Sequence, residues 1–205
     1  MKKLLLMSAI GFSLVAGGVT AQPAAAPKAA AASIEAGSYK LDPHHTQVIW
    51  AVDHMGFSRL EGMVGGMSGT LQLDPAKPQA AALTVDIPLS GLTVTSEQFA
   101  GHLKTPDLFD TAKFPTARFV SRTVAVNGQD ATITGDLTLR GVTKPVTLKA
   151  KFYGAGTNPM SKAKTVGFSA TAQVKRSDFG LGYGVPAVSD QVDLEINAAF
   201  EKSAG

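Results

Sequence analysis

Apolar and polar side chains alternate along most of the chain between residues 48 and 200, and this period of two limits the fold more than any other feature. Because successive side chains of a β-strand point to opposite faces, each alternating segment has one apolar and one polar face. The pattern predicts an all-β domain whose strands enclose an apolar interior. The longest alternating segments are residues 83–89, 146–152, 166–174 and 192–200.

Shorter alternating segments at residues 48–52, 119–124 and 133–139 raise the expected number of strands, and the glycine-rich stretch 62–73 adds one that we expect to be bent or bulged. Strict alternation in the segment 119–124 places Phe119 and Val124 on opposite faces. The total is about eight strands, a spacing typical of a sandwich or a barrel. Closure into a barrel would remove the exposed edges of an open sheet.

One segment, residues 95–114, departs from the period of two. Phe99 and Leu103 are four residues apart and would share a helix face. Thr95 with Gln98 fits a capping box, and Thr105-Pro106 fits a second helix start with proline in its first turn. The segment therefore predicts a helical insertion of two short helices, whose apolar face would close one end of a barrel.

The N-terminal residues have the features of an export signal. Lys2 and Lys3 precede an apolar run at residues 4–16, and Val19-Thr20-Ala21 fits a cleavage site with small residues. A membrane anchor is the alternative, but the run is shorter than the roughly 20 residues that span a bilayer. We expect residues 1–21 to be a cleaved signal peptide, 22–38 an Ala/Pro-rich linker, and 39–203 the folded domain of a periplasmic protein.

Composition excludes several classes of function. The chain has no cysteine, which rules out disulfides, thiol catalysis and a lipid-modified N-terminal cysteine. Basic residues are scattered, and the formal charge is only +3, so nucleic-acid binding has no electrostatic basis. No Gly-x-Ser-x-Gly or phosphate-loop motif is present. The four histidines lack helical metal-ligand spacing and are interpreted as structural. We therefore expect no enzyme, no metal and no cofactor.

Seven motifs follow one another in order along residues 39–201: residues 42–46 (DPHHT), 50–56 (WAVDHMG), 102–110 (HLKTPDLFD), 114–119 (FPTARF), 135–146 (GDLTLRGVTKPV), 176–180 (RSDFG) and 190–192 (DQV). Together they resemble the motifs of the YceI-like family. The resemblance implies an eight-stranded antiparallel lipocalin-like barrel with a helical insertion. It also implies an internal apolar channel for polyisoprenoid lipids, a periplasmic location, no established catalysis and a possible homodimer.

The residues alone leave open whether the interior is a packed core or a cavity, because both small and large side chains occur on the apolar faces. With the resemblance, we expect a cavity lined by apolar, aromatic and histidine side chains. The candidate ligand-binding residues are Trp50, Val52, His54, Phe57, Phe99, Leu103, Phe109, Phe119, Phe152, Phe168 and Phe179. Candidates to contact a polar head group are His45, Arg140 and Arg176, with His54 as a further possibility. The alternative for each arginine is a surface charge beside the end of a strand.

The expected function is binding of an isoprenoid or other long-chain lipid, as a periplasmic carrier or store. One alternative is an enzyme or stress factor that acts on an isoprenoid quinone or its precursor, in which case the lipid or quinone would be the bound ligand. Another is an interaction module with a solid core. We expect no nucleic-acid partner and no integral membrane segment after signal cleavage.

Overall fold

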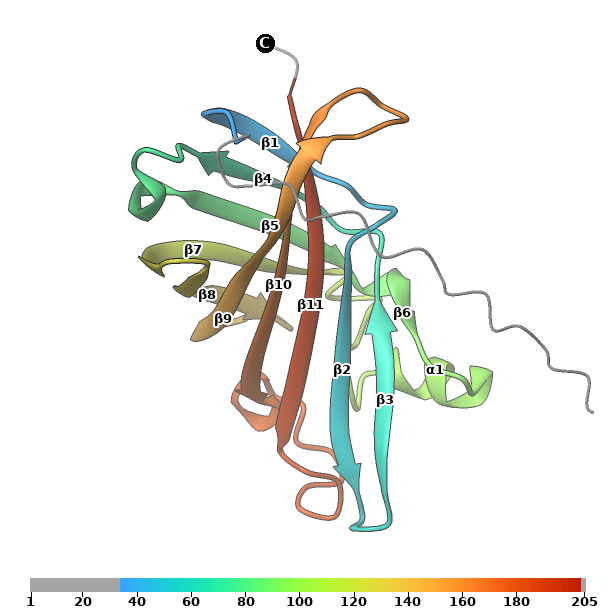
Figure 1. Ribbon diagram of the computed structural model, residues 1–205. Coiled ribbons are helices and arrows are strands. Elements are labelled where there is room, and N and C mark those ends of the chain that lie inside the picture. Colours follow the sequence, from blue (N-terminus) through green and yellow to red (C-terminus); the bar gives the residue numbers. More distant parts are fainter. Residues whose placement is uncertain (1–33, 204–205) are drawn as a thin grey trace, which may run out of the picture.

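Eight antiparallel strands close into a barrel in the computed structural model, which describes residues 34–203 (Figure 1). β1 pairs with β4 on one side and with β11 on the other, and this double pairing closes the ring. The prediction of an eight-stranded antiparallel barrel is confirmed. In ring order the strands are β1 (Gly37–Leu41), β4 (Ser68–Leu73), β5 (Ala82–Pro88), β7 (Thr116–Asn127), β8 (Asp130–Leu139), β9 (Val142–Thr157), β10 (Lys164–Lys175) and β11 (Gln191–Lys202).

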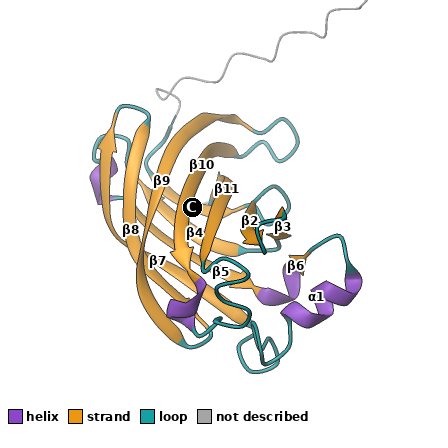
Figure 2. Cartoon of the chain, turned by 90° about the horizontal axis from the view of Figure 1, so that it is seen from below, coloured by secondary structure: helices purple, strands orange, loops and turns teal. Residues whose placement is uncertain are grey.

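Three further strands extend the sheet at one end of the barrel. β2 (Gln47–His54) and β3 (Ser58–Val64) form a hairpin, and the short β6 (Leu92–Thr93) pairs with β3. β11 pairs with β1 near its C-terminus and with β2 over its middle, so β1 and β2 follow one another along the same edge. Figure 2 shows these strands beside the helical insertion.

The predicted bent strand at residues 62–73 is divided between β3 and β4. The break lies at Gly65–Met67, where Gly66 has a φ of 71°, a left-handed torsion that glycine adopts without steric cost. β1 begins at Gly37, two residues before the expected start of the domain. The predicted signal peptide, residues 1–21, and the linker up to residue 33 lie outside the described residues.

A bulge in β7 corrects one prediction of side-chain direction. The register between β7 and β8 shifts between Ser121 and Thr123, so Arg122 is an extra residue in the strand. Beyond the bulge the alternation is reversed, and Val124 faces the interior like Phe119. The prediction that these two side chains lie on opposite faces was wrong, because it assumed uninterrupted pairing.

The insertion contains one α-helix, α1 (Glu97–Leu103), and not two. Its cap is Ser96, whose Oγ accepts a hydrogen bond from the Phe99 N–H at 3.3 Å, so the predicted cap at Thr95 was one residue early. The predicted second helix at Thr105-Pro106 is a series of turns, interrupted at Asp110, which has a left-handed φ of 48°. Single-turn 3₁₀ segments occur at Pro78–Ala80, Leu89–Gly91 and Arg176–Phe179.

The fully buried apolar side chains form three clusters along the barrel wall, and half-buried residues such as Leu83, Val48 and Phe109 connect them. One cluster includes Tyr39 and Phe200, the second includes Phe119 and Phe179, and the third includes Leu92 near the insertion. Side chains of a filled barrel would meet across its axis. In this barrel the clusters surround a cavity instead.

Gly135 on β8 provides a test of the close packing in the wall. A Cβ at this position would lie 2.4 Å from Cζ of Phe119 and 2.5 Å from the carbonyl oxygen of Val120. We expect Gly135→Ala to lower the free energy of unfolding by about 2 kcal/mol, since overpacking forces neighbouring atoms to move. Urea unfolding measures the change. The matched control is Gly101→Ala on α1, where an added Cβ meets no atom within 4 Å and stability should not fall. Equal stability of the two variants would contradict the tight contact.

Candidate functional site

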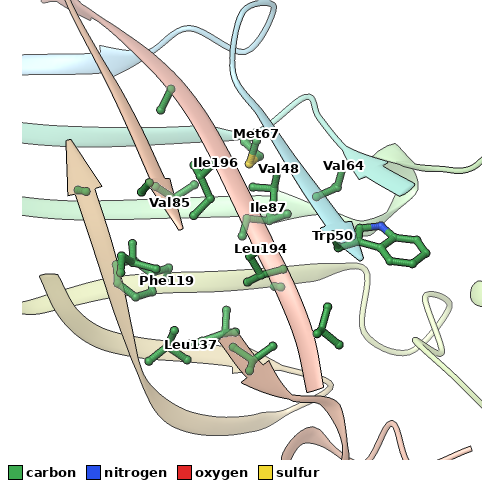
Figure 3. Close-up of a pocket in the computed structure, with 18 of the residues that line it drawn as sticks. Val48, Trp50, Val64, Met67, Val85, Ile87, Phe119, Leu137, Leu194 and Ile196 are labelled. Carbon is green, nitrogen blue, oxygen red and sulfur yellow. The ribbon is translucent and has the colours of Figure 1, made fainter. Parts of the chain in front are cut away.

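A cavity of about 1010 Å³ lies inside the barrel. Every strand of the ring contributes lining residues, and β2, β3, β6 and α1 add more at one end. Figure 3 shows Val85 and Ile87 of β5, Phe119 of β7, and Leu194 and Ile196 of β11 around the same space. The lining is almost entirely aliphatic and aromatic, so the cavity suits an apolar molecule.

Most of the residues selected from the sequence lie on the wall of this cavity. The structure therefore brings together side chains from four strands, α1 and the loops that follow α1 and β10. Those that line the cavity are Trp50, Val52, His54, Phe99, Leu103, Phe109, Phe119, Phe152, Phe168 and Phe179. No ligand contact has been tested for any of them, so their role in binding stays a prediction.

Trp50 is one of the residues that line the cavity. The ring lies against Gly62 on the neighbouring strand, where an added Cβ would come within 2.3 Å of Cζ2, so the absence of a side chain at Gly62 makes room for the indole. The indole Nε1 is enclosed and has no hydrogen-bond partner among the described residues. Trp50 therefore offers an incoming molecule an apolar surface, and its enclosed N–H is not accessible as a donor.

Three of the selected residues, Phe57, His45 and Arg140, do not line the cavity, which corrects the sequence-based selection. Phe57 follows the tip of the β2–β3 hairpin and is 89% exposed. Its neighbours Met55 and Gly56 both have positive φ, so the turn directs the Phe57 side chain away from the barrel. His45 is also exposed, and its Nδ1 lies 2.6 Å from Oδ2 of Asp42.

Asp42 and His45 form a local pair before β2. Burial raises the pKa of the Asp42 carboxyl, but hydrogen bonds from His45 and from the His44 N–H outweigh it and leave that pKa below its ordinary value. The pair fixes the turn that leads into β2. Its neighbours Leu41 and Thr46 line the cavity, but neither His45 nor Asp42 does.

Arg140 connects two loops and does not line the cavity. It occupies the turn between β8 and β9 with a φ of 53°. Its Nη1 donates to the Gly180 carbonyl at 2.7 Å, and its Nη2 donates to the Pro106 carbonyl at 2.8 Å. The guanidinium thus holds the insertion against the loop after β10, a structural role that differs from both sequence interpretations.

Arg176 lies in the cavity wall at the end of β10 and is buried. Four of its five N–H groups donate to backbone carbonyls of the loop that leads to β11. These acceptors, at 2.5–2.8 Å, are the carbonyl oxygens of Leu181, Tyr183, Val188 and Ser189. The guanidinium therefore holds the backbone of this loop in place, and one of its N–H groups remains for a ligand head group.

Burial lowers the pKa of the Arg176 guanidinium from its ordinary value, and the nearby Asp190 opposes this shift. Asp190 accepts hydrogen bonds from the Ser177 N–H at 2.8 Å and from its Oγ at 2.7 Å. The backbone N–H of Ser177, followed by its hydroxyl, lowers the pKa of the Asp190 carboxyl. These bonds join the beginning and the end of the loop.

The cavity reaches exposed residues at both ends of the barrel, and the two ends differ in chemistry. At the end near α1, the lining includes Met55, His102 and Tyr183, and the rings of His102 and Tyr183 pack edge to face with centroids 5.4 Å apart. At the opposite end, beside the β7–β8 turn, the lining includes Gln129, Asp130 and Lys151. We call these the apolar mouth and the polar mouth.

Several lining residues were absent from the sequence-based selection. Leu83, Val85, Leu194 and Ile196 belong to strand faces that the alternation had identified, so a signal for them existed. Loop residues such as Tyr183 carried no such signal, because alternation says nothing about where a loop side chain points. Among residues 34–203 there is no group of three His, Asp or Glu side chains arranged as metal ligands. None of the helices described has the length and apolarity to cross a bilayer.

The comparison with known proteins decides the family. The model of the YceI-like domain matches residues 39–200. The chain belongs to the YceI-like domain family. Protein YceI of Escherichia coli is 38% identical over 169 residues, which cover 82% of this chain and 88% of that protein. A UPF0312 protein of Pseudomonas putida is 39% identical over 165 residues, or 79% of this chain and 85% of that protein.

Solved structures show the same YceI-like fold. BcnA of Burkholderia cenocepacia superposes with a TM-score of 0.70 at 24% identity, covering 78% of this chain and 98% of BcnA. A polyisoprenoid binding domain from Saccharophagus degradans has a TM-score of 0.62 at 14% identity, covering 82% of this chain and all of that domain. At these identities the likeness shows the fold alone.

Proposed function

We propose that this YceI-like protein binds a long isoprenoid-type lipid inside the barrel, as a carrier or store in the periplasm, and that it is a binding protein and not an enzyme. The observation that carries the proposal is the apolar cavity of about 1010 Å³, which extends between the two ends of the barrel. Its volume is at the upper limit of the range of about 300–1,000 Å³ typical of small-molecule sites. A long chain fits such a space better than a compact ligand.

The energetics of the lining support a hydrocarbon ligand. Each CH₂ group removed from water contributes about 0.8 kcal/mol, so even a partly buried isoprenoid chain binds strongly. The wall offers few directional contacts, since Arg176 uses four N–H groups within its own loop and Trp50 has its N–H enclosed. Selectivity should therefore depend on the length and shape of the chain. The polyisoprenoid binding domain of similar fold is in keeping with this ligand class.

Native mass spectrometry tests this proposal. The full chain is expressed in a Gram-negative host and purified from the periplasmic fraction without detergent. We expect the measured mass to equal that of a chain beginning at Gln22 plus one bound lipid of isoprenoid mass. The same protein after organic extraction should take up one added molecule of geranylgeraniol, an isoprenoid alcohol. Protein that is recovered empty and takes up neither geranylgeraniol nor a fatty acid would contradict lipid binding.

A further inference from the structure

Four exposed apolar side chains surround the apolar mouth, and we call them the rim. They are Met55 (51% exposed), Phe57 (89%), Tyr183 (58%) and Val185 (37%). Met55 and Phe57 belong to the β2–β3 turn, and the other two belong to the loop between β10 and β11. Figure 1 shows this turn beside that loop at the lower end of the barrel.

Hydrogen bonds hold the two parts of the rim together. The Met55 N–H donates to the Ala187 carbonyl at 2.8 Å, and His54 forms a β-bridge with Val188. The Ser189 N–H donates to the Asp53 carbonyl at 2.9 Å. Within the turn, the Phe57 N–H donates to the His54 carbonyl at 3.1 Å, although this turn places Met55, a non-glycine residue, at a left-handed φ of 61°. The apolar side chains are thus presented to solvent by a defined backbone.

The rim is continuous with the cavity. Met55 and Tyr183 are each half exposed and also line the cavity, so one side chain touches both solvent and the interior. The polar mouth also has an exposed apolar lining residue, Val126 of β7, but it stands beside Gln129, Asp130 and Lys151. At the apolar mouth, by contrast, the rim joins four exposed apolar side chains into one surface that leads directly into the ligand space.

We propose that the rim docks on the surface of a lipid bilayer, with Phe57 and Met55 among the acyl chains, so that an apolar ligand passes between membrane and cavity without crossing water. This inference rests on the proposed lipid-binding function. Apolar side chains at the membrane interface bind in proportion to the area they bury. The charged neighbour Arg59 is already paired with Glu61 and with Asp193. Docking should therefore be insensitive to salt.

Co-sedimentation with neutral phosphatidylcholine vesicles tests the docking. We expect Phe57→Gln to weaken vesicle binding about tenfold, because the buried aromatic area is lost. The matched control is Met160→Gln, which also replaces an apolar residue that is 88% exposed but lies in the β9–β10 connection at the opposite end. This control should bind vesicles like the wild type. All three proteins should bind geranylgeraniol in vesicle-free solution with equal affinity, because neither residue lines the cavity.

The outcomes separate the two proposals. Docking is overturned if the wild-type protein does not bind vesicles, or if both variants lose vesicle binding equally. In that case, binding of geranylgeraniol would still support the lipid-binding function. Vesicle binding that depends on Phe57 without any uptake of geranylgeraniol or bound lipid supports docking and overturns the lipid-binding function. If gel filtration shows that Phe57→Gln converts a dimer to a monomer and vesicle binding is unchanged, the rim is an interface between copies and docking is overturned.

Discussion

Ala170→Phe should weaken binding of geranylgeraniol about 30-fold. Ala170 lies on β10, lines the cavity, and pairs with Ala150 of β9 and Ile196 of β11. A phenyl ring at this position would occupy space that the ligand needs. Excluding two or three CH₂ groups at about 0.8 kcal/mol each costs about 2 kcal/mol, which corresponds to roughly 30-fold in the dissociation constant. Titration followed by native mass spectrometry measures the affinity of the empty protein.

The neighbouring variant Thr171→Phe is the matched control. Thr171 is exposed on the outer face of the same strand, so the same new side chain points away from the cavity. We expect its affinity to equal that of the wild-type protein. Equal affinities of the two phenylalanine variants would show that ligand does not occupy this part of the barrel.

The stability of Ala170→Phe gives an independent test of the hollow interior. In a packed core, a side chain enlarged to this extent would cost about 1–3 kcal/mol, because its neighbours must move. In the cavity the ring finds open space and buries its own apolar surface, so the free energy of unfolding should be unchanged or higher. A large loss of stability would indicate that the interior is filled by side chains.

The strand faces were predictable because alternation is a local property. The inward residues of β11, from Val192 to Phe200, follow directly from their order in the sequence, and all five line the cavity. The prediction failed in β7 because the bulge at Arg122 depends on pairing with β8 and leaves no local signal. The size of the cavity was not predictable from composition, since it depends on how far opposite walls stand apart.

The roles of loop residues were less accessible to sequence reasoning. Arg140 and Arg176 were identified as candidates for a head group, but their partners are backbone carbonyls, of distant segments for Arg140 and of the following loop for Arg176. Every residue has such a carbonyl, so no side-chain pattern marks the acceptor. Phe57 was selected for the cavity, whereas the left-handed torsions of Met55 and Gly56 turn the chain before it. Whether a loop side chain reaches the cavity depends on the three-dimensional path of the chain, which no local pattern reveals.

Arg176→Met should lower the free energy of unfolding by about 3 kcal/mol. The substitution keeps an unbranched apolar stem but leaves four carbonyl oxygens without their charged donor, and each buried acceptor left unpaired costs about 1–3 kcal/mol. For a domain of this size, the melting temperature should fall by about 10 °C. Hydrogen exchange should also accelerate at residues 181–189, because this loop depends on the guanidinium.

Two further variants separate the geometry of the guanidinium from its charge. Arg176→Lys keeps the charge but has a single nitrogen, which cannot reach acceptors now bonded to three nitrogens, so it should recover little of the lost stability. Lys175→Met removes an exposed positive charge one residue earlier and should leave the melting temperature unchanged. If Arg176→Lys restored wild-type stability, the positive charge near Asp190 would be the dominant contribution to stability. The planar guanidinium that links the loop to the wall of the cavity would then contribute little.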